Sequence, residues 1–311
     1  MAVAWFGGSY ESHGDVAIWL GMKTDSEEGA WEYPIKIADE PDVPHWNPVL
    51  SRGTDGAIHL FYKVGSNARD WRTRTKVSRD EGRSWSSYRE LPLLDGFTAG
   101  PVKDKPIVLS DGSWLAPTSR ETETEWDAAV TLSKDDGDTW ELGGPVPLDH
   151  AAVEGKGIIQ PTLWESDSGS VHMLLRSDAG NIYRSDSMDS GKTWCGAYPT
   201  SLPNNNSGID LDRLSNGSLV LCYNPVDLSW GKRTPLALSI SEDNGTSWDT
   251  SIILEDEDPP TDEERVKLDR ANRPNEFSYP AILALGNRIH VTYTWKRQRI
   301  CYRILEIEED A

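Results

Sequence analysis

Residues 78–85 read S-R-D-E-G-R-S-W, and the same pattern, S-x-D-x-G-x-[ST]-W, returns three more times along the chain. The other copies are SKDDGDTW at 133–140, SMDSGKTW at 187–194 and SEDNGTSW at 241–248. The tryptophans that end the copies stand at 85, 140, 194 and 248, so the steps are 55, 54 and 54 residues. One more step back from Trp85 reaches Trp31, behind a degenerate copy. This fixed interval predicts a chain of repeated structural units.

Each copy has the residues of a tight turn. The aspartate can accept hydrogen bonds from the N–H groups of the turn, and the glycine adopts a positive φ that other residues avoid. The tryptophan buries a large area against a neighbouring unit. If these aspartates were catalytic, four copies at one spacing would require four identical active sites. We therefore assign them a structural role.

Short strands with alternating or continuous apolar patterns fill the intervals between the copies. Hairpin turns such as Asp55-Gly56, Asp111-Gly112 and Asn216-Gly217 introduce these strands. Evenly spaced short strands with a recurring aromatic motif predict an all-β fold, a β-propeller whose blades have four strands. The 311 residues hold nearly six periods, so we expect one six-bladed domain over residues 1–311.

The two ends of the chain depart from the repeat. The segment MAVAWFGG at 1–8 matches the second strand of the other blades, and the last blade has only three strands before the chain ends. We therefore expect blade 1 to lack its N-terminal strand. The hypothesis that follows is that Met1 is an internal or misassigned start.

The charge balance excludes several classes of partner. The chain has 31 Lys and Arg against 51 Asp and Glu, a formal net charge of −20. Nucleic-acid surfaces need a basic stripe, so no nucleic-acid partner is expected, and an anionic membrane surface is disfavoured for the same reason. No apolar stretch approaches the roughly 20 residues that a spanning helix needs, so no membrane insertion is expected. An anionic small substrate remains compatible, because a local arginine cluster can bind one.

Redox and targeting signals are absent from the sequence. The three cysteines, Cys195, Cys222 and Cys301, fit no metal or redox spacing, and we predict neither a metal site nor a cofactor. No charged N-terminal region is followed by an apolar run, so no signal peptide is recognisable and a cytoplasmic protein is the default expectation.

The repeated box and the strand pattern resemble the sialidase superfamily. S-x-D-x-G-x-T-W is similar to the Asp box of that superfamily, whose fold is the six-bladed propeller. Stretches such as GPVKDKP, IQPTL, LPNNNSGID and SYPAI also resemble its branch of BNR-repeat sialidase-like proteins, and the similarity covers essentially the whole chain. The resemblance implies an exo-acting glycosidase that removes a terminal acidic sugar, similar to sialic acid, from a glycan.

The resemblance also implies catalytic residues. Sialidases carry an acid/base aspartate on the loop that corresponds to residues 7–15, and both Glu11 and Asp15 lie near the matching position. They use a tyrosine nucleophile on the loop that enters blade 6. Phe277 matches this tyrosine best, and Tyr279 lies two positions later on the same strand face. Tyr279 is the candidate nucleophile if the register shifts; otherwise the sialidase mechanism is broken.

Substrate-binding residues are expected on the loops between second and third strands and on those entering first strands. Sialidases hold the substrate carboxylate with three arginines, because a guanidinium fork matches a carboxylate. The first arginine falls in the region missing from blade 1, and Arg176 sits where the family has another. The candidate cations are Arg120, Arg176, Arg233, Arg297, Lys63 and Lys105. The other candidates for binding an anionic carbohydrate are His45, Gln160, Asn206 and Asn224.

Two other functions stay open. A polysaccharide lyase, or a glycosidase for uronate- or rhamnose-containing glycans, would use His13 or His45 as its base. A carbohydrate-binding propeller without catalysis is the third reading. The mismatch at Phe277 and the missing first arginine favour these two readings over strict sialidase activity.

Overall fold

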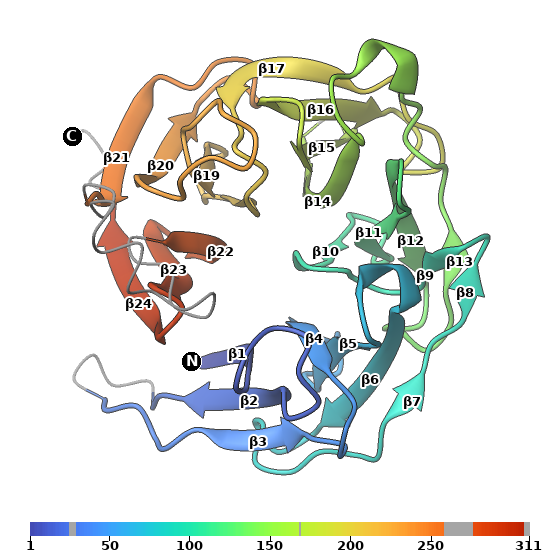
Figure 1. The fold of residues 1–311 in the computed structure, drawn as a ribbon, viewed down its shortest axis with the longest axis vertical. Coiled ribbons are helices and arrows are strands. Elements are labelled where there is room, and N and C mark those ends of the chain that lie inside the picture. Colours follow the sequence, from blue (N-terminus) through green and yellow to red (C-terminus); the bar gives the residue numbers. More distant parts are fainter. Residues whose placement is uncertain (25–28, 168, 258–275, 308–311) are drawn as a thin grey trace. The chain divides into compact units, whose positions relative to one another are not determined.

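The computed structural model describes residues 1–24, 29–167, 169–257 and 276–307. The chain divides into two compact units, residues 1–123 with 128–145 and residues 124–127 with 146–311. Each unit carries three of the antiparallel sheets predicted as blades (Figure 1). Within the described ranges, no helix is long and apolar enough to cross a membrane. A single domain over residues 1–311 stays a prediction.

Unit 1 holds blades 1 to 3, in which the strands pair in chain order. Blade 1 consists of β1 (Ala2–Gly7), β2 (Ala17–Met22) and β3 (Ile35–Ala38). Blade 2 consists of β4 (His45–Arg52), β5 (Ile58–Val64), β6 (Arg72–Ser78) and β7 (Arg89–Glu90), with the short 3-10 helix η1 (Ala68–Asp70) between β5 and β6. A small hairpin of β8 (Leu93–Leu94) and β9 (Phe97–Thr98) precedes blade 3. Blade 3 consists of β10 (Ile107–Val108), β11 (Trp114–Glu121), β12 (Trp126–Ser133) and β13 (Glu141–Leu142).

Unit 2 holds blades 4 to 6, after the 3-10 helix η2 (His150–Ala152). Blade 4 consists of β14 (Ile158–Glu165), β15 (Val171–Ser177), β16 (Asn181–Ser187) and β17 (Tyr198–Pro203). Blade 5 consists of β18 (Asp210–Arg213), β19 (Leu219–Tyr223), β20 (Leu236–Ser241) and β21 (Thr250–Glu255). Blade 6 consists of β22 (Phe277–Leu285), β23 (Arg288–Trp295) and β24 (Arg299–Glu306). The described parts of blades 1 and 6 thus have three strands each, as the repeat predicts.

The repeated box forms the turn between the third and fourth strands of blades 2 to 5. In blade 3, Asp135 accepts hydrogen bonds from the Thr139 N–H at 2.8 Å, the Thr139 hydroxyl at 2.5 Å and the Ser133 hydroxyl at 2.8 Å. The same three bonds recur in blades 2, 4 and 5. In blade 4 the bonds from Thr193 and Ser187 lower the pKa of Asp189 to about 2. The structural role predicted for these aspartates is confirmed.

The box tryptophan of blade 3 packs its own blade against blade 2. Trp140 of blade 3 is buried, and its ring meets Phe61 of blade 2 edge-on with the centroids 6.0 Å apart. The Trp140 Nε1 donates to the Gly137 carbonyl of its own turn at 3.0 Å, so the polar atom is satisfied inside the core. Gly137 has a φ of +86°, which lets the turn place that carbonyl under the ring. Fully burying one such ring contributes about 1.5–3 kcal/mol.

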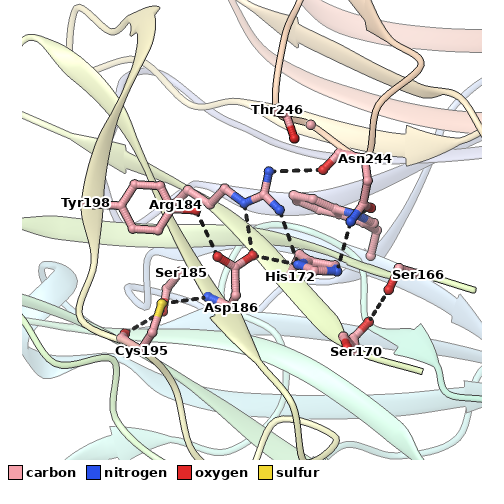
Figure 2. A network of polar contacts seen from close by, with 12 residues as sticks. Ser166, Ser170, His172, Arg184, Ser185, Asp186, Cys195, Tyr198, Asn244 and Thr246 are labelled. Atoms are coloured by element: carbon pink, nitrogen blue, oxygen red, sulfur yellow. Dashed lines mark hydrogen bonds and ion pairs between the residues drawn. The ribbon is translucent and has the colours of Figure 1, made fainter. Parts of the chain in front are cut away.

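A polar network centred on Asp186 reinforces blade 4 (Figure 2). Asp186 Oδ1 lies 2.6 Å from His172 Nδ1 and accepts from Arg184 Nε at 2.9 Å. Its Oδ2 accepts from the Tyr198 hydroxyl at 2.8 Å, so both oxygens are occupied. Burial raises the pKa of Asp186, but the bonds from His172, Tyr198 and Arg184 outweigh burial and lower it to about 2.

The same network reaches the box turn of blade 5. Arg184 Nη1 donates to the Asn244 carbonyl at 3.0 Å, and Asn244 is the fourth residue of that box (Figure 2). The Asn244 side chain accepts from Trp164 Nε1 at 2.7 Å and lies 3.2 Å from His172 Nε2. Asn244 has a φ of +60°, which an asparagine tolerates better than most residues. Blades 4 and 5 are therefore joined by directional bonds as well as by apolar packing.

We expect Asp186→Asn to lower the midpoint of thermal unfolding by several degrees at pH 7, because the amide leaves Arg184 and His172 without an anionic acceptor. The folded pKa of about 2 lies below the unfolded value near 3.8, so this contribution is complete above about pH 4 and is lost as the pH falls through 2. The difference between wild type and variant should therefore shrink as melting is measured by circular dichroism from pH 7 towards pH 2. A difference that stays constant with pH would contradict the assignment.

The control is Asp167→Asn, because the Asp167 side chain is 90% exposed and, among the described residues, pairs only with Arg213. Exposed ion pairs contribute little, so this variant should melt like the wild type at every pH.

Candidate functional site

Three first strands carry the same irregularity, a β-bulge at a residue that precedes proline. The pairing register shifts between Trp46 and Val49 in β4, between Ile159 and Thr162 in β14, and between Ser278 and Ala281 in β22. The residues turned aside are Asn47, Gln160 and Tyr279, with φ of +38°, +51° and +52°. Each precedes a proline, which has no N–H to donate to the ladder. Bulges of this kind re-aim a side chain, and positive φ at such residues marks functional sites.

Arg176 of β15 is held by two amides in unit 2. Its Nε donates to Asn206 Oδ1 at 2.9 Å, and its Nη1 donates to Gln160 Oε1 at 2.8 Å. All three side chains are buried, with Arg176 only 6% exposed. Among the described residues, Nη2 of Arg176 donates to no acceptor. The guanidinium lies 5.9 Å from the centre of the Tyr279 ring, so the two amides aim it at the tyrosine.

Arg233 approaches the same ring from the chain segment before β20. Its guanidinium carbon is 4.8 Å from the centre of the Tyr279 ring, and its Nη2 is 3.5 Å from the tyrosine oxygen. Its Nη1 donates to Glu276 Oε1 at 2.8 Å. Burial lowers the pKa of Arg233, but the adjacent Tyr279 and Glu276 outweigh burial, and the pKa stands above its ordinary value. The residue is therefore a permanent cation beside the tyrosine.

Glu276 is the buried carboxylate that organises this corner. It is 3% exposed, and it accepts from Arg233, from Arg297 Nε at 2.8 Å and from the Ser278 hydroxyl at 2.8 Å. Burial raises the pKa of Glu276, but the two arginines and Ser278 hold it below its ordinary value. Removing one partner of such a buried pair leaves a charge uncompensated, which costs about 3–5 kcal/mol.

Arg297 reaches Glu276 from the turn between β23 and β24. The Gln298 N–H donates to the Trp295 carbonyl at 3.0 Å, which closes a two-residue turn over Lys296 and Arg297. Both central residues have positive φ, +52° and +53°, a geometry that usually selects glycine or asparagine. The Lys296 N–H donates to the Glu276 carbonyl at 2.7 Å. The turn therefore adopts an unfavourable backbone conformation, and in this conformation Arg297 contacts Glu276.

The buried amides also leave polar atoms unpaired. Asn224 donates to the carbonyls of Pro235 and Phe277 at 2.8 and 2.9 Å, which ties β19 to the start of β22. Neither Asn224 Oδ1 nor Asn206 Nδ2 has a hydrogen-bond partner in the described part of the chain. A buried amide atom without a partner is costly, so the Asn206 Nδ2 is available to a substrate oxygen beside Arg176.

The structure distinguishes between Phe277 and Tyr279. Phe277 is fully buried, belongs to the apolar core of blades 5 and 6, and packs against Trp295. Tyr279 is turned out of that face by the bulge and lies between Arg176 and Arg233. Residues two apart on a regular strand share one face. Phe277 and Tyr279 do not, because the bulge inserts an extra residue into the pairing.

The two acid candidates of unit 1 differ in their surroundings. Asp15 accepts from the Ser9 N–H at 3.0 Å, from the Ser9 hydroxyl at 2.6 Å and lies 2.7 Å from His13 Nδ1. These bonds, led by Ser9, hold the pKa of Asp15 well below its ordinary value, so it stays ionised at neutral pH. Glu11 is exposed on the same loop. The loop therefore holds one carboxylate fixed by hydrogen bonds and one exposed carboxylate, and the choice of the acid between them stays a prediction.

Two predicted binding residues are buried in blade 2. Lys63 is fully buried, and its Nζ donates to the hydroxyls of Thr73 and Thr98 at 2.5 and 3.0 Å. His45 Nδ1 lies 2.8 and 3.0 Å from the carbonyls of Val43 and Val16, and its ring stacks on Tyr62. These positions favour structural roles, because neither side chain is exposed to a ligand.

The remaining predicted cations of unit 1 do not form one cluster. Arg120, near the end of β11, is exposed and lies over the Phe97 ring at 5.0 Å. Lys105 is half-buried just before β10. Unit 2 thus brings together Arg176, Arg233, Arg297, Gln160, Asn206, Asn224 and Tyr279. Glu276 was not predicted as a site residue, because nothing in the sequence indicates that it is buried between two arginines.

In the described ranges no group of three or more His, Cys, Asp or Glu side chains is placed to hold a metal ion.

Comparison with known proteins supplies the family. The BNR repeat-like domain family matches residues 1–291. A protein named sialidase from Paraclostridium sordellii is 31% identical over 218 residues, which are 59% of this chain and 50% of that protein. The chain therefore spans half the length of this curated relative.

Solved structures agree with this relationship. The Hadza microbial sialidase Hz136 matches with a TM-score of 0.75 at 15% identity, over 98% of this chain and 63% of that one. A protein of unknown function from Dyadobacter fermentans matches with 0.74 at 16% identity, over 99% and 91%. A Trypanosoma rangeli sialidase, solved in complex with sialic acid, matches with 0.67 at 16% identity, over 98% and 51%. At these identities the likeness shows the fold.

The predicted fold is therefore confirmed: the chain is an all-β protein with the six-bladed β-propeller fold of its sialidase neighbours. Because the family match covers nearly all of the sequence, this chain belongs to the BNR repeat-like domain family, within the sialidase-like superfamily.

Proposed function

We propose that this chain is an exo-acting glycosidase that removes a terminal acidic sugar, of the sialic acid type, from glycans. The observation that carries the proposal is the position of Tyr279 between two buried guanidinium groups, 5.9 and 4.8 Å from its ring centre. Among glycosidases, sialidases are those that use a tyrosine nucleophile. The family match and the relative named sialidase support the same class of reaction.

The two arginines suit a substrate carboxylate. Asn206 and Gln160 fix the plane of the Arg176 guanidinium, and its Nη2 can donate to a ligand. The unpaired Asn206 Nδ2 adds a neutral donor. Planar guanidinium groups bind a carboxylate through paired N–H···O bonds, and fixing their planes in advance lowers the entropy lost on binding. Unit 2 of a chain with a net charge of −20 gathers three arginines in one cluster, with Arg176 and Arg233 buried and Arg297 partly buried, and such a cluster is suited to an anionic ligand.

Tyr279 then acts on the anomeric carbon. A neutral phenol is a weak nucleophile, and Arg233 Nη2, 3.5 Å from its oxygen, together with Arg176 favours negative charge there. The phenol loses its proton to solvent as its oxygen bonds to the anomeric carbon, the bond to the leaving oxygen breaks, and that oxygen takes the proton of an acid. Water then attacks the same carbon and gives a proton to the carboxylate that the acid has become. This releases the sugar and the tyrosine oxygen, which takes up a proton again from solvent.

The proton donor that we propose is Glu11, on the loop of unit 1. Asp15 is held ionised by Ser9 and His13, and it orders this loop. Glu11 is exposed and lies on the same loop as Asp15. A positioned carboxylic acid typically contributes about 10²–10⁴ in rate.

The alternative functions have less support. His45, a base candidate for a lyase, faces two backbone carbonyls inside blade 2, and His13 is bonded to Asp15. A plain binding surface has no need for a tyrosine kept at positive φ between two buried arginines, because such strain persists where function requires it.

Tyr279→Phe should lower kcat for release of a fluorogenic sialoside by about 10³-fold or more, because the nucleophile is lost while Arg176 and Arg233 remain. KM and the unfolding midpoint should change little. The matched control is Tyr33→Phe, since Tyr33 is 97% exposed, and it should retain wild-type turnover. Unchanged turnover in Tyr279→Phe would end the proposal. Absence of sialoside release by the wild type, with new unsaturated-uronate absorbance on an acidic polysaccharide, would assign a lyase instead.

Glu11→Gln should lower kcat/KM by about 10²–10⁴-fold on a natural sialoside, whose alcohol leaving group needs protonation. The loss should be much smaller on an aryl sialoside with an acidic leaving group. Asp15→Asn should lower activity equally on both substrates, because it disturbs the loop rather than the proton. If instead Asp15→Asn shows the dependence on the leaving group and Glu11→Gln does not, the acid is Asp15. Full activity in both variants would remove the acid from this loop.

A further inference from the structure

Unit 1 has a cleft that the proposed reaction at Tyr279 does not use. It lies beside η1 and the start of β6, and the β8–β9 hairpin and the end of β11 complete it. Its volume, with the open mouth included, is about 380 Å³. Much of this volume is open solvent, so the enclosed part suits a small charged group such as a carboxylate or a sulfate rather than a whole sugar.

The lining of the cleft is strongly basic for so acidic a chain. Arg69, Arg72 and Arg120 line it against a single carboxylate, Glu121. Arg72 is exposed and makes no ion pair within the described residues. Arg69 is paired with Glu123 at 2.7 Å, which fixes its guanidinium at the mouth. The three arginines of the cleft outnumber the two carboxylates Glu121 and Glu123, an excess of positive charge that attracts an anion in a protein with a net charge of −20.

Two buried donors that line the cleft have no partner. Trp71 Nε1 and Ser119 Oγ are buried polar atoms without a hydrogen bond in the described part of the chain. Both residues are 8% exposed. Native proteins rarely leave such donors unpaired, and an unpaired donor in a ligand site gains its partner when an oxygen of the ligand binds.

A buried lysine, Lys63, lies next to the lining of the cleft. Lys63 Nζ donates to the hydroxyl of Thr98, a residue that lines the cleft, at 3.0 Å. No carboxylate pairs with Lys63 among the residues that the structure describes. Burial lowers the pKa of Lys63 to about 7, and an anion in the cleft would favour its protonated form.

We propose that this cleft binds the oxyanion of an acidic sugar, a carboxylate or a sulfate, with Arg72 and Arg120 as the charged partners and Trp71 and Ser119 as neutral donors. The site goes beyond the proposed glycosidase reaction and does not depend on Tyr279. It reassigns Arg120, which the sequence placed in one cluster with Arg176 and Arg233, to a site of its own within unit 1. A chain with this cleft recognises a second charged sugar in its glycan.

The test uses the full chain with ¹⁵N-labelled tryptophan and the Tyr279→Phe substitution, so that hydrolysis does not intervene. Trp71→Phe identifies the Trp71 indole resonance. Tetragalacturonate supplies the carboxylate, a κ-carrageenan tetrasaccharide supplies the sulfate, and an agarose tetrasaccharide is the neutral comparison. We expect one or both charged probes to shift the Trp71 indole resonance and the neutral probe to leave it unchanged, and the tighter of the two names the oxyanion.

The combined Arg72→Gln and Arg120→Gln substitutions should weaken the charged probe at least about tenfold, as expected for the loss of two charge-assisted bonds. The matched control is Arg79→Gln, because Arg79 is 73% exposed and lies on blade 2 outside the cleft; its affinity should be unchanged. No shift with either charged probe, equal shifts with the neutral one, or full affinity in the double variant would overturn the proposal. Failure of sialoside turnover leaves these results intact, so the two proposals fail separately.

Discussion

The carboxylate of Glu276, buried between Arg233 and Arg297, is the interaction on which the candidate site depends. It fixes one guanidinium beside the oxygen of Tyr279 and the other on a strained turn, and it does so at the first residue before β22. Separating these buried charges costs much free energy, because each would then lack a partner in a medium of low dielectric constant. The bulge at Tyr279-Pro280 completes the arrangement, since it brings the tyrosine out of the strand face and into the reach of Arg176.

Much of the fold could be predicted from the sequence because the repeat is dense and chemically specific. Asp135 and its counterparts make the turn bonds that the S-x-D-x-G-x-[ST]-W pattern requires, and Trp140 packs on the preceding blade as expected. The unit-2 residues Arg176, Arg233 and Arg297 could also be chosen as candidates, since the family resemblance marked their loops.

The register of the site could not be predicted, and the reason is local geometry. Counting by two along an ideal strand puts Phe277 and Tyr279 on one face, and only the bulge separates them. The recurring X-Pro step at Asn47, Gln160 and Tyr279 was the available signal, because proline leaves a gap in the ladder. The direction of the Lys63 side chain could not be predicted for another reason: β5 is buried throughout and gives no alternation to show which way a cation points.

An acidic surface and basic binding positions are compatible in this protein because electrostatic interactions are local. Salt at physiological strength screens exposed charges beyond about 8 Å, whereas buried guanidinium groups keep their full effect on a ligand in contact. The net charge of −20 is therefore compatible with the anionic ligand that we propose beside the arginines of unit 2.

The most direct measurement of the central claim is covalent trapping of the nucleophile. A sialosyl fluoride with a second fluorine beside the anomeric carbon forms the glycosyl–enzyme bond but releases it slowly, so peptide mass spectrometry can locate the modified residue. Our account predicts one sugar per chain, attached to the peptide that contains Tyr279, and no adduct in Tyr279→Phe. An adduct on an aspartate or glutamate, or rapid turnover of the reagent with every peptide unmodified, would contradict it.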